Sequence, residues 1–236
     1  MRNPLTRIRK LSALSLALCG FTLLPLAAQA DTISLIFDGS STSSNTPATG
    51  ASGTVDLTFT DQTSGDVLLT LDITNTTGTI PSFGDGATTS KLTGFGFNLL
   101  TDVTYVASSF AGDTNLTTLL QNANAAPFGP LDLAVADNNN WQGGNANNAL
   151  PQGSSNTVSL QLTVGAFGDA SGLASAFFEG FSDDLTSVMR FQQVNAGAGS
   201  DKLTNPTVVP LPAAAWLFGS ALLGMAGIGY RGTRKS

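Results

Sequence analysis

The sequence predicts an all-β domain over residues 31–200, an antiparallel β-sandwich of the jelly-roll or immunoglobulin-like kind. The first observation is strict alternation of apolar and polar residues in Thr54–Thr60 and, over eight residues, in Thr157–Val164. Such alternation is typical of half-buried strands. The second is that turn-forming Asp, Asn, Gly, Ser and Thr cluster between the alternating segments, as at 61–65 and 75–78. One-sided strands at this spacing favour two antiparallel sheets packed face to face.

The other strands follow from the same pattern. Alternation is clear in Asp66–Thr74 and in Leu92–Leu100, where Phe95, Phe97 and Leu99 should point inward. Weaker alternation predicts four more strands: Thr32–Phe37, Val103–Val106, Ala176–Phe181 and Ser187–Val194. The expected core contains Val55, Leu57, Phe59, Leu69, Leu71, Phe95, Phe97, Leu160 and Leu162.

Three segments lack the alternation. The stretch 111–152 is rich in Asn, Ala, Gly and Pro, which predicts a long surface loop with a short helix at Asn115–Gln121. A second stretch, 40–53, is expected to be a flexible connection after the first strand. The stretch 201–209 is expected to be a linker that separates the domain from the end of the chain.

The first thirty residues, 1–30, have the three parts of a secretory signal peptide. Four basic residues precede an apolar segment at 11–26, and Ala28 and Ala30 form an A-x-A cleavage site before Asp31. We therefore expect signal peptidase to release a chain that begins at Asp31. The alternative is a retained N-terminal anchor. The only cysteine, Cys19, lies in the predicted signal peptide, so the mature chain has none.

The last residues, 210–236, have the composition of a membrane tail. The stretch 213–230 carries no charge. As a helix it would be about 27 Å long, enough for a single transmembrane span. The basic residues Arg231, Arg234 and Lys235 follow it, where the positive-inside rule places the cytoplasmic end.

A short motif precedes this apolar stretch. It consists of Val209, Pro210, Leu211, Pro212 and Ala213. Together with the apolar stretch and the basic cluster, it resembles the PEP-CTERM sorting signal in its Val-Pro-Leu-Pro-Ala variant (VPLPA-CTERM). Leu211 stands where the commoner form of the motif has glutamate. The match covers about residues 208–235.

The resemblance implies that the chain is the substrate of an exosortase, a protease-transpeptidase of the membrane. It further implies a Gram-negative cell in which the protein is anchored in the inner membrane before processing. The processed protein would then reach the cell surface or the exopolysaccharide matrix of a biofilm. The alternative is a permanent single-pass anchor.

The charge and the residue types of the chain limit the classes of function that it can have. Residues 31–209 carry sixteen acidic and three basic residues, a net charge of −13, which repels nucleic acid. The chain has no histidine and the mature chain no cysteine, which excludes Ser-His-Asp and Cys-His catalysis and leaves no nitrogen or sulfur ligands for zinc. Together with the resemblance to the sorting signal, these observations predict a non-catalytic surface or matrix protein that needs no cofactor and associates with exopolysaccharide.

Two alternatives of other classes stay open. Trp141, beside Asn139 and Asn140, could stack on a sugar in a lectin-like loop; the other interpretation is that it covers the edge of the core. Glu179, paired with Asp183 or Asp184, could serve a carboxylate-based hydrolase, since glycosidases need two acids. The other interpretation of Asp183 and Asp184 is a solvated turn.

Calcium is the one metal that the residue types favour, because it prefers carboxylate and amide oxygens. The candidate ligands lie at Asp137–Asn140, at Asp183 with Asp184, and at Asp113. None of these segments has the spacing of a known calcium loop, and solvated loops are the alternative.

Overall fold

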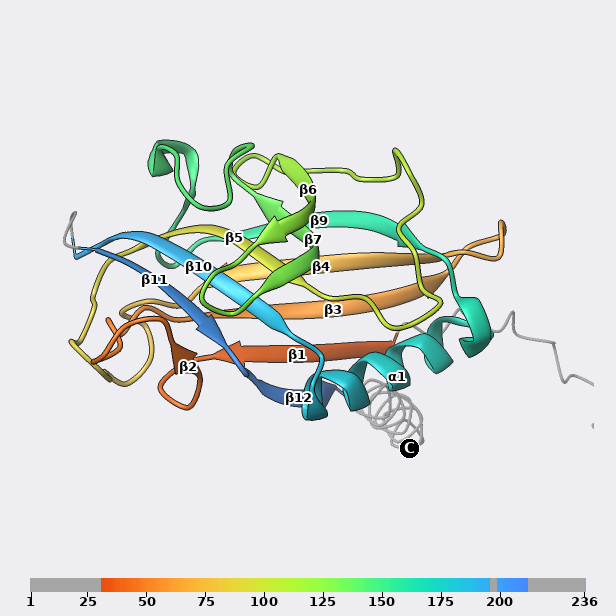
Figure 1. Cartoon of the computed structure of the whole chain (residues 1–236), viewed down its shortest axis with the longest axis horizontal. Helices are drawn as coiled ribbons and strands as arrows, with labels where there is room; N and C mark the ends of the chain where they lie inside the picture. Colours follow the sequence, from red (N-terminus) through yellow and green to blue (C-terminus); the bar gives the residue numbers. More distant parts are fainter. Residues whose placement is uncertain (1–30, 196–198, 212–236) are drawn as a thin grey trace, which may run out of the picture.

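The structure is a computed structural model that describes residues 31–195 and 199–211, and two antiparallel sheets dominate it (Figure 1). The five-stranded sheet has the order β12 (Thr207–Leu211), β1 (Asp31–Phe37), β3 (Gly53–Asp61), β4 (Val67–Asn75), β9 (Ser155–Leu162). The seven-stranded sheet has the order β2 (Thr42–Ser43), β11 (Gly199–Thr204), β10 (Ser187–Val194), β5 (Lys91–Phe97), β7 (Pro130–Ala136), β6 (Thr118–Asn124), and β8 (Leu150–Pro151) also pairs with β5. Within these described ranges, the strands are joined by one α-helix, α1 (Ala170–Asp183), and by two short 3₁₀ turns, η1 (Ala146–Asn148) and η2 (Gly165–Phe167), besides loops. The prediction of an all-β sandwich is confirmed at this level.

The predicted core is also confirmed. All nine residues expected inside are buried, none more than 1% exposed. In β3 the inward side chains alternate with partly exposed ones, as the sequence pattern indicates. Within the described residues no helix is long and apolar enough to cross a membrane. The predicted span, 213–230, lies outside the described residues, as does the predicted signal peptide, 1–30.

The predicted strand at Ala176–Phe181 is wrong, because this segment belongs to α1. The Asp169 side chain caps the helix by accepting a hydrogen bond from the Gly172 N–H at 2.8 Å. The buried residues of α1 recur every three or four positions, which is the period of a helix face. They are Ala170, Leu173, Ala174, Phe177 and Phe181. A six-residue window is too short to show this period.

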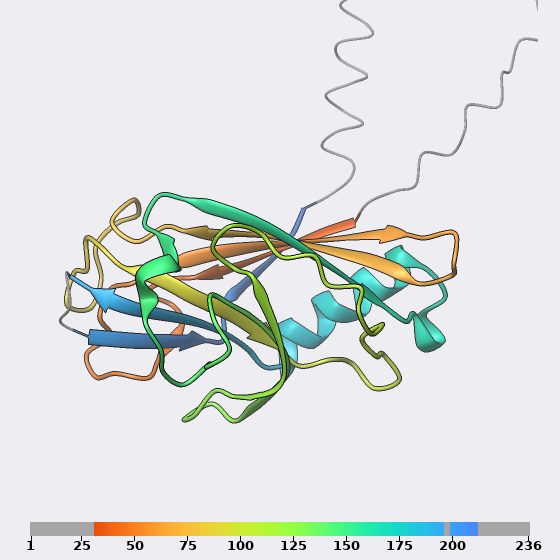
Figure 2. The ribbon, with the colours of Figure 1, turned by 90° about the horizontal axis from the view of Figure 1, so that it is seen from above.

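Helix α1 packs against β1, β3 and β12 of the five-stranded sheet, at one end of the sandwich (Figure 2). Phe177 joins the helix to both sheets, with ring centroids 5.5 Å from Phe59 of β3 and 6.1 Å from Phe97 of β5. The helix therefore fills the space that the two sheets leave between them at this end.

The predicted loop at 111–152 contains strands, and the predicted helix at Asn115–Gln121 overlaps strand β6 instead. The adjoining strand β7 was missed because both of its faces are covered. Leu133 and Val135 enter the main core, whereas Ala134 and Ala136 belong to a second apolar cluster outside the sheet. A strand buried on both faces shows no alternation. The predicted strand at 103–106 is not formed; this segment makes only an isolated bridge, between Tyr105 and Leu162.

The predicted linker at 201–209 is wrong as well, because it forms most of β11 and most of β12. Asp201, 1% exposed, accepts hydrogen bonds from the Ser43 hydroxyl at 2.7 Å and the Thr49 N–H at 3.0 Å. These bonds attach the stretch 40–53, expected to be a flexible connection, to β11. The polar residues that suggested a linker thus form hydrogen bonds between the stretch 40–53 and β11.

Candidate functional site

The first part of the predicted sorting motif belongs to an edge strand of the sandwich. Val209 and Pro210 in β12 are paired with Ser34 and Ile33 of β1, and Leu211 with Thr32. Strand β12 is the edge of its sheet, where proline is tolerated because one side of the strand needs no ladder hydrogen bonds. Pro212 and Ala213 lie outside the described residues.

This pairing brings the start of β1, which follows the predicted signal-peptide cleavage site, next to the described part of the predicted sorting motif. The strand partners Thr32 and Leu211 stand one residue after Asp31 and two residues before Ala213. Figure 2 shows the start of β1 (red) and the end of β12 (blue) near each other on one side of the molecule. Ala28 and Ala30 lie outside the described residues.

Trp141 is buried, with 4% of its surface exposed. It belongs to an outer cluster that consists of Ala123, Ala125, Leu131, Ala134, Ala136, Trp141 and Val188. The indole lies over β5 so closely that a Cβ added to Gly94 would stand 2.6 Å from it. Its faces are therefore not free to stack on a sugar, and the arrangement fits the interpretation that Trp141 covers the edge of the core.

The neighbouring asparagines are exposed and shape the loop that carries Trp141. The Asn140 side chain accepts hydrogen bonds from the N–H groups of Gln142 and Gly143, each at 3.1 Å. Asn139 is exposed beside it. The Arg190 guanidinium of β10 donates to the Gln142 carbonyl at 3.1 Å and to the Thr93 hydroxyl at 3.2 Å, which anchors this loop to the seven-stranded sheet.

Asp137, at the start of the same loop, is a buried ionisable residue. Burial raises the pKa of its carboxyl above the ordinary value, while the hydrogen bond from Asn138 and the charge of Arg190 act in the opposite direction. Its Oδ2 is buried without a hydrogen-bond partner in the described structure. Burial likewise lowers the pKa of Arg190, and Asp137 partly offsets this. The charges of Asp137 and Arg190 therefore each favour the ionised form of the other group, against the effect of burial.

This environment predicts a pH dependence for Asp137. Because its folded-state pKa lies above the ordinary value of 3.8, the contribution of the carboxyl to stability is present below 3.8 and lost as the pH rises through the folded-state pKa. Relative to Asp137→Asn, the free energy of unfolding of the wild type should fall as the pH is raised from about 3 to about 7. Urea unfolding at a series of pH values measures this difference.

Asp113 provides a control of opposite sign. Hydrogen bonds from the backbone N–H groups of Thr114 and Thr157 lower the pKa of its carboxyl. The contribution of this carboxyl to stability is therefore present above pH 3.8 and lost as the pH falls through the lowered pKa. Asp113→Asn should thus lower the free energy of unfolding only at higher pH. Parallel stability curves for the wild type and both variants would contradict both assignments.

The remaining carboxylates do not converge. Glu179, Asp183 and Asp184 are exposed along the last turns of α1 and at its C-cap. They lie on one surface rather than on two walls that face each other across a substrate. Among the described residues, no three side chains of His, Cys, Asp or Glu come together as a metal-binding group. The Asp113 carboxylate is instead engaged by Thr114, Asn156 and Thr157.

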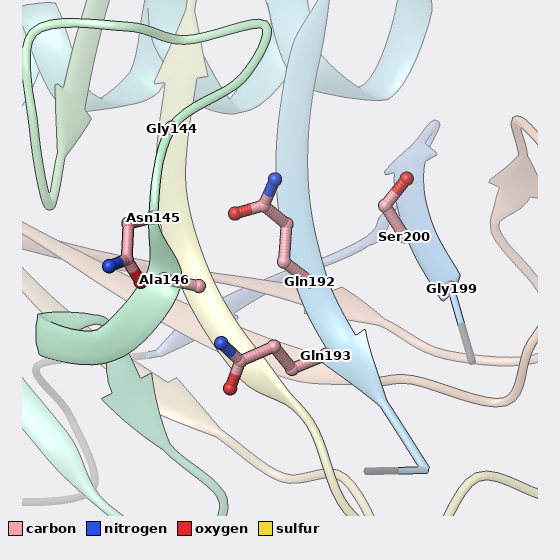
Figure 3. Close-up of a pocket in the computed structure, with 7 residues that line it drawn as sticks. All are labelled: Gly144, Asn145, Ala146, Gln192, Gln193, Gly199 and Ser200. Carbon is pink, nitrogen blue, oxygen red and sulfur yellow. The ribbon is translucent and has the colours of Figure 1, made fainter. Parts of the chain in front are cut away.

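A polar groove of about 450 Å³ lies beside the Trp141 loop, where β10 ends and β11 begins (Figure 3). Its lining residues are Gly144, Asn145, Ala146, Gln192, Gln193, Gly199 and Ser200. Sequence reasoning missed this site. The one available signal was the pair Gln192-Gln193, two polar residues in succession that break the alternation of the predicted strand Ser187–Val194.

No family model matches the chain, and no match to a curated protein or to a solved structure was found. The proposals below stand on the sequence and on the geometry of the described residues.

Proposed function

We propose that this protein is an exported, non-catalytic cell-surface or biofilm-matrix protein that is processed at both ends. Signal peptidase cleaves before Asp31, and an exosortase recognises the motif that begins at Val209. The inner membrane holds the precursor through the span 213–230 before release to the surface or the exopolysaccharide matrix of a Gram-negative cell. The observation that carries the proposal is the pairing of β1 with β12.

This pairing suits a domain that both ends connect to one membrane. Directly opposed residues of antiparallel strands have Cα atoms about 4.5–5.5 Å apart. Since Thr32 and Leu211 are such partners, a signal peptide and a tail helix can enter the same membrane side by side while the sandwich stays folded.

The strand β12 also leaves little room for a stalk. It reaches Leu211, and the predicted span begins at Ala213, so Pro212 alone separates the sheet from the membrane segment. The negative charge of the domain, −13 over residues 31–209, limits its adhesion to anionic lipid and makes a specific tail necessary for anchoring. We further propose that the sandwich is of the jelly-roll or immunoglobulin-like kind; the sorting of the protein does not depend on this assignment.

Processing is tested on the native protein and on the variant Pro210→Ala/Pro212→Ala. Each proline fixes φ near −65° and lacks an N–H, which keeps the motif extended and out of the tail helix. We expect intact-mass analysis of the native protein to show the loss of residues 1–30 and of the tail. The double variant should accumulate in the membrane fraction with its tail attached.

Pro206→Ala is the matched control, because Pro206 lies in the turn just before β12 and outside the motif. It should be processed as the wild type is. A full-length mass in the cytoplasmic fraction would refute export. Normal release of the double variant would instead show that the prolines are not recognised.

A further inference from the structure

A β-bulge forms one wall of the polar groove. Strand β10 pairs with β11 so that Phe191 opposes Asp201 and Val194 opposes Gly199. Two residues of β10, Gln192 and Gln193, therefore stand opposite the single residue Ser200. In a regular strand two successive side chains point to opposite faces, and a bulge changes this direction. Figure 3 shows both glutamines directed toward the loop that carries Asn145.

The bulge is an unfavourable arrangement for the fold alone. Gln193 has φ of 48°, in the left-handed region that non-glycine residues seldom adopt. The Gln192 Oε1 is buried and has no hydrogen-bond partner among the described residues. Local strain and an unsatisfied acceptor at one place point to a role outside folding.

The facing wall is held by a helix cap. The Asn145 Oδ1 accepts a hydrogen bond from the Asn147 N–H at 2.9 Å, which fixes the side chain at the start of η1. The amide nitrogen of Asn145 is then the polar group that remains for a ligand. Gly199 presents backbone without a side chain, and nothing lies within 4 Å of the place that a Cβ would occupy, so a ligand can approach closely.

We propose that this groove binds a segment of a neutral, hydroxyl-rich polysaccharide. Its polar side chains are three amides and one hydroxyl, which together offer donors and acceptors without charge. Sugar hydroxyls have the same double capacity. The groove lacks a basic side chain, and the domain carries −13, so an anionic chain is disfavoured. A volume of about 450 Å³ is in the range of small-ligand sites.

The inference deepens the proposed function, on which it rests for the presence of extracellular polysaccharide. It also replaces Trp141 as the basis for sugar recognition, because the indole is buried whereas Gln193 and Ser200 of the groove are exposed.

The test uses the full chain, purified in a detergent that has no sugar headgroup. The probes are cellohexaose, mannohexaose and maltohexaose, with an acidic oligogalacturonate as the comparison. Saturation-transfer NMR detects contact, and titration gives Kd. We expect at least one neutral probe to bind and oligogalacturonate not to bind.

The main variant is Gln192→Met/Gln193→Met, which keeps side-chain length and removes both amides. It should raise Kd at least tenfold, the equivalent of about one net hydrogen bond. The matched control is Gln121→Met, an exposed glutamine on β6 outside the groove, which should bind as the wild type does. A second variant, Asn145→Ser, keeps the helix cap and removes the amide nitrogen, so it should also weaken binding even where the double variant fails to fold.

Absence of binding by all three neutral probes, or equal Kd values for the wild type and a folded groove variant, would overturn the inference. Preference for oligogalacturonate would overturn the choice of a neutral ligand. None of these results affects export and tail processing, which the mass analysis judges independently. Conversely, glycan binding by a chain that stays in the cytoplasm would refute display and leave the groove assignment standing.

Discussion

Truncation of Phe177 to alanine should lower the free energy of unfolding by about 3–5 kcal/mol, the usual cost of a fully buried phenylalanine. The ring has no exposed surface, and it contacts Phe59 and Phe181 with centroids at 5.5 Å and 5.6 Å. The cavity would open where α1 meets both sheets, so neighbouring rings cannot all move in to fill it. For a domain of this size the melting temperature should fall by about 6–20 °C.

Phe178→Ala is the matched control. It lies on the same helix, makes the same chemical change and has the same effect on helix propensity, but its ring is only partly buried. We expect it to cost about 1–2 kcal/mol. Both values come from urea unfolding of the mature protein. An equal decrease in the free energy of unfolding for the two variants would show that α1 does not pack against the sheets as described.

The helix also shows what sequence patterns can predict for this chain. Strands β3, β4 and β9 alternate between buried and more exposed residues, so their pattern predicts both their type and their inward residues. Strand β5 is buried on both faces, but glycines occupy its outer face, so its alternation of phenylalanine and glycine is equally informative. Helix α1 was missed because glycine and alanine dilute its apolar face. β7 was missed because the outer cluster covers its second face. The sequence pattern was therefore informative where the two faces of an element carry different kinds of residue.

The candidate sites also differ in how far the sequence alone can predict them. The predicted sorting motif is a contiguous segment, so a sequence pattern alone can suggest it without a structure. The groove depends on one extra residue in β10 and on a loop some fifty positions away, which only the strand register brings together. For Trp141 the sequence left two interpretations open, and the structure favours the buried one, because two glycines in β5 leave space for large side chains above them. Gly94 provides that space for Trp141.

The position of the motif within β12 has a consequence for processing. A membrane protease binds its substrate as an extended backbone, and here one side of that backbone is paired with β1. Val208 packs against the core, and α1 contacts the same strand. Since only Pro212 separates β12 from the predicted span, we expect β12 to detach from β1 before the enzyme can engage the motif.

A disulfide that locks β12 to β1 tests this step. Ser34→Cys and Val209→Cys would place two cysteines at directly opposed positions. Opposed Cα atoms at about 4.5–5.5 Å fall within the range that disulfides span. The mature chain has no other cysteine, and the compartment outside the inner membrane is oxidising. We expect the double variant to accumulate in the membrane with its tail attached, and a reductant to restore processing.

Two controls separate the lock from its side effects. The single variant Val209→Cys reports any loss of recognition caused by the motif change alone, and a reductant should not alter its processing. The pair Thr54→Cys and Thr74→Cys, opposed in β3 and β4, adds a disulfide away from β12 and should be processed normally. If the locked chain is released as fast as the β3–β4 pair, then the enzyme acts on the tail without freeing β12. Recognition would in that case begin at Pro212, beyond the last strand of the sandwich.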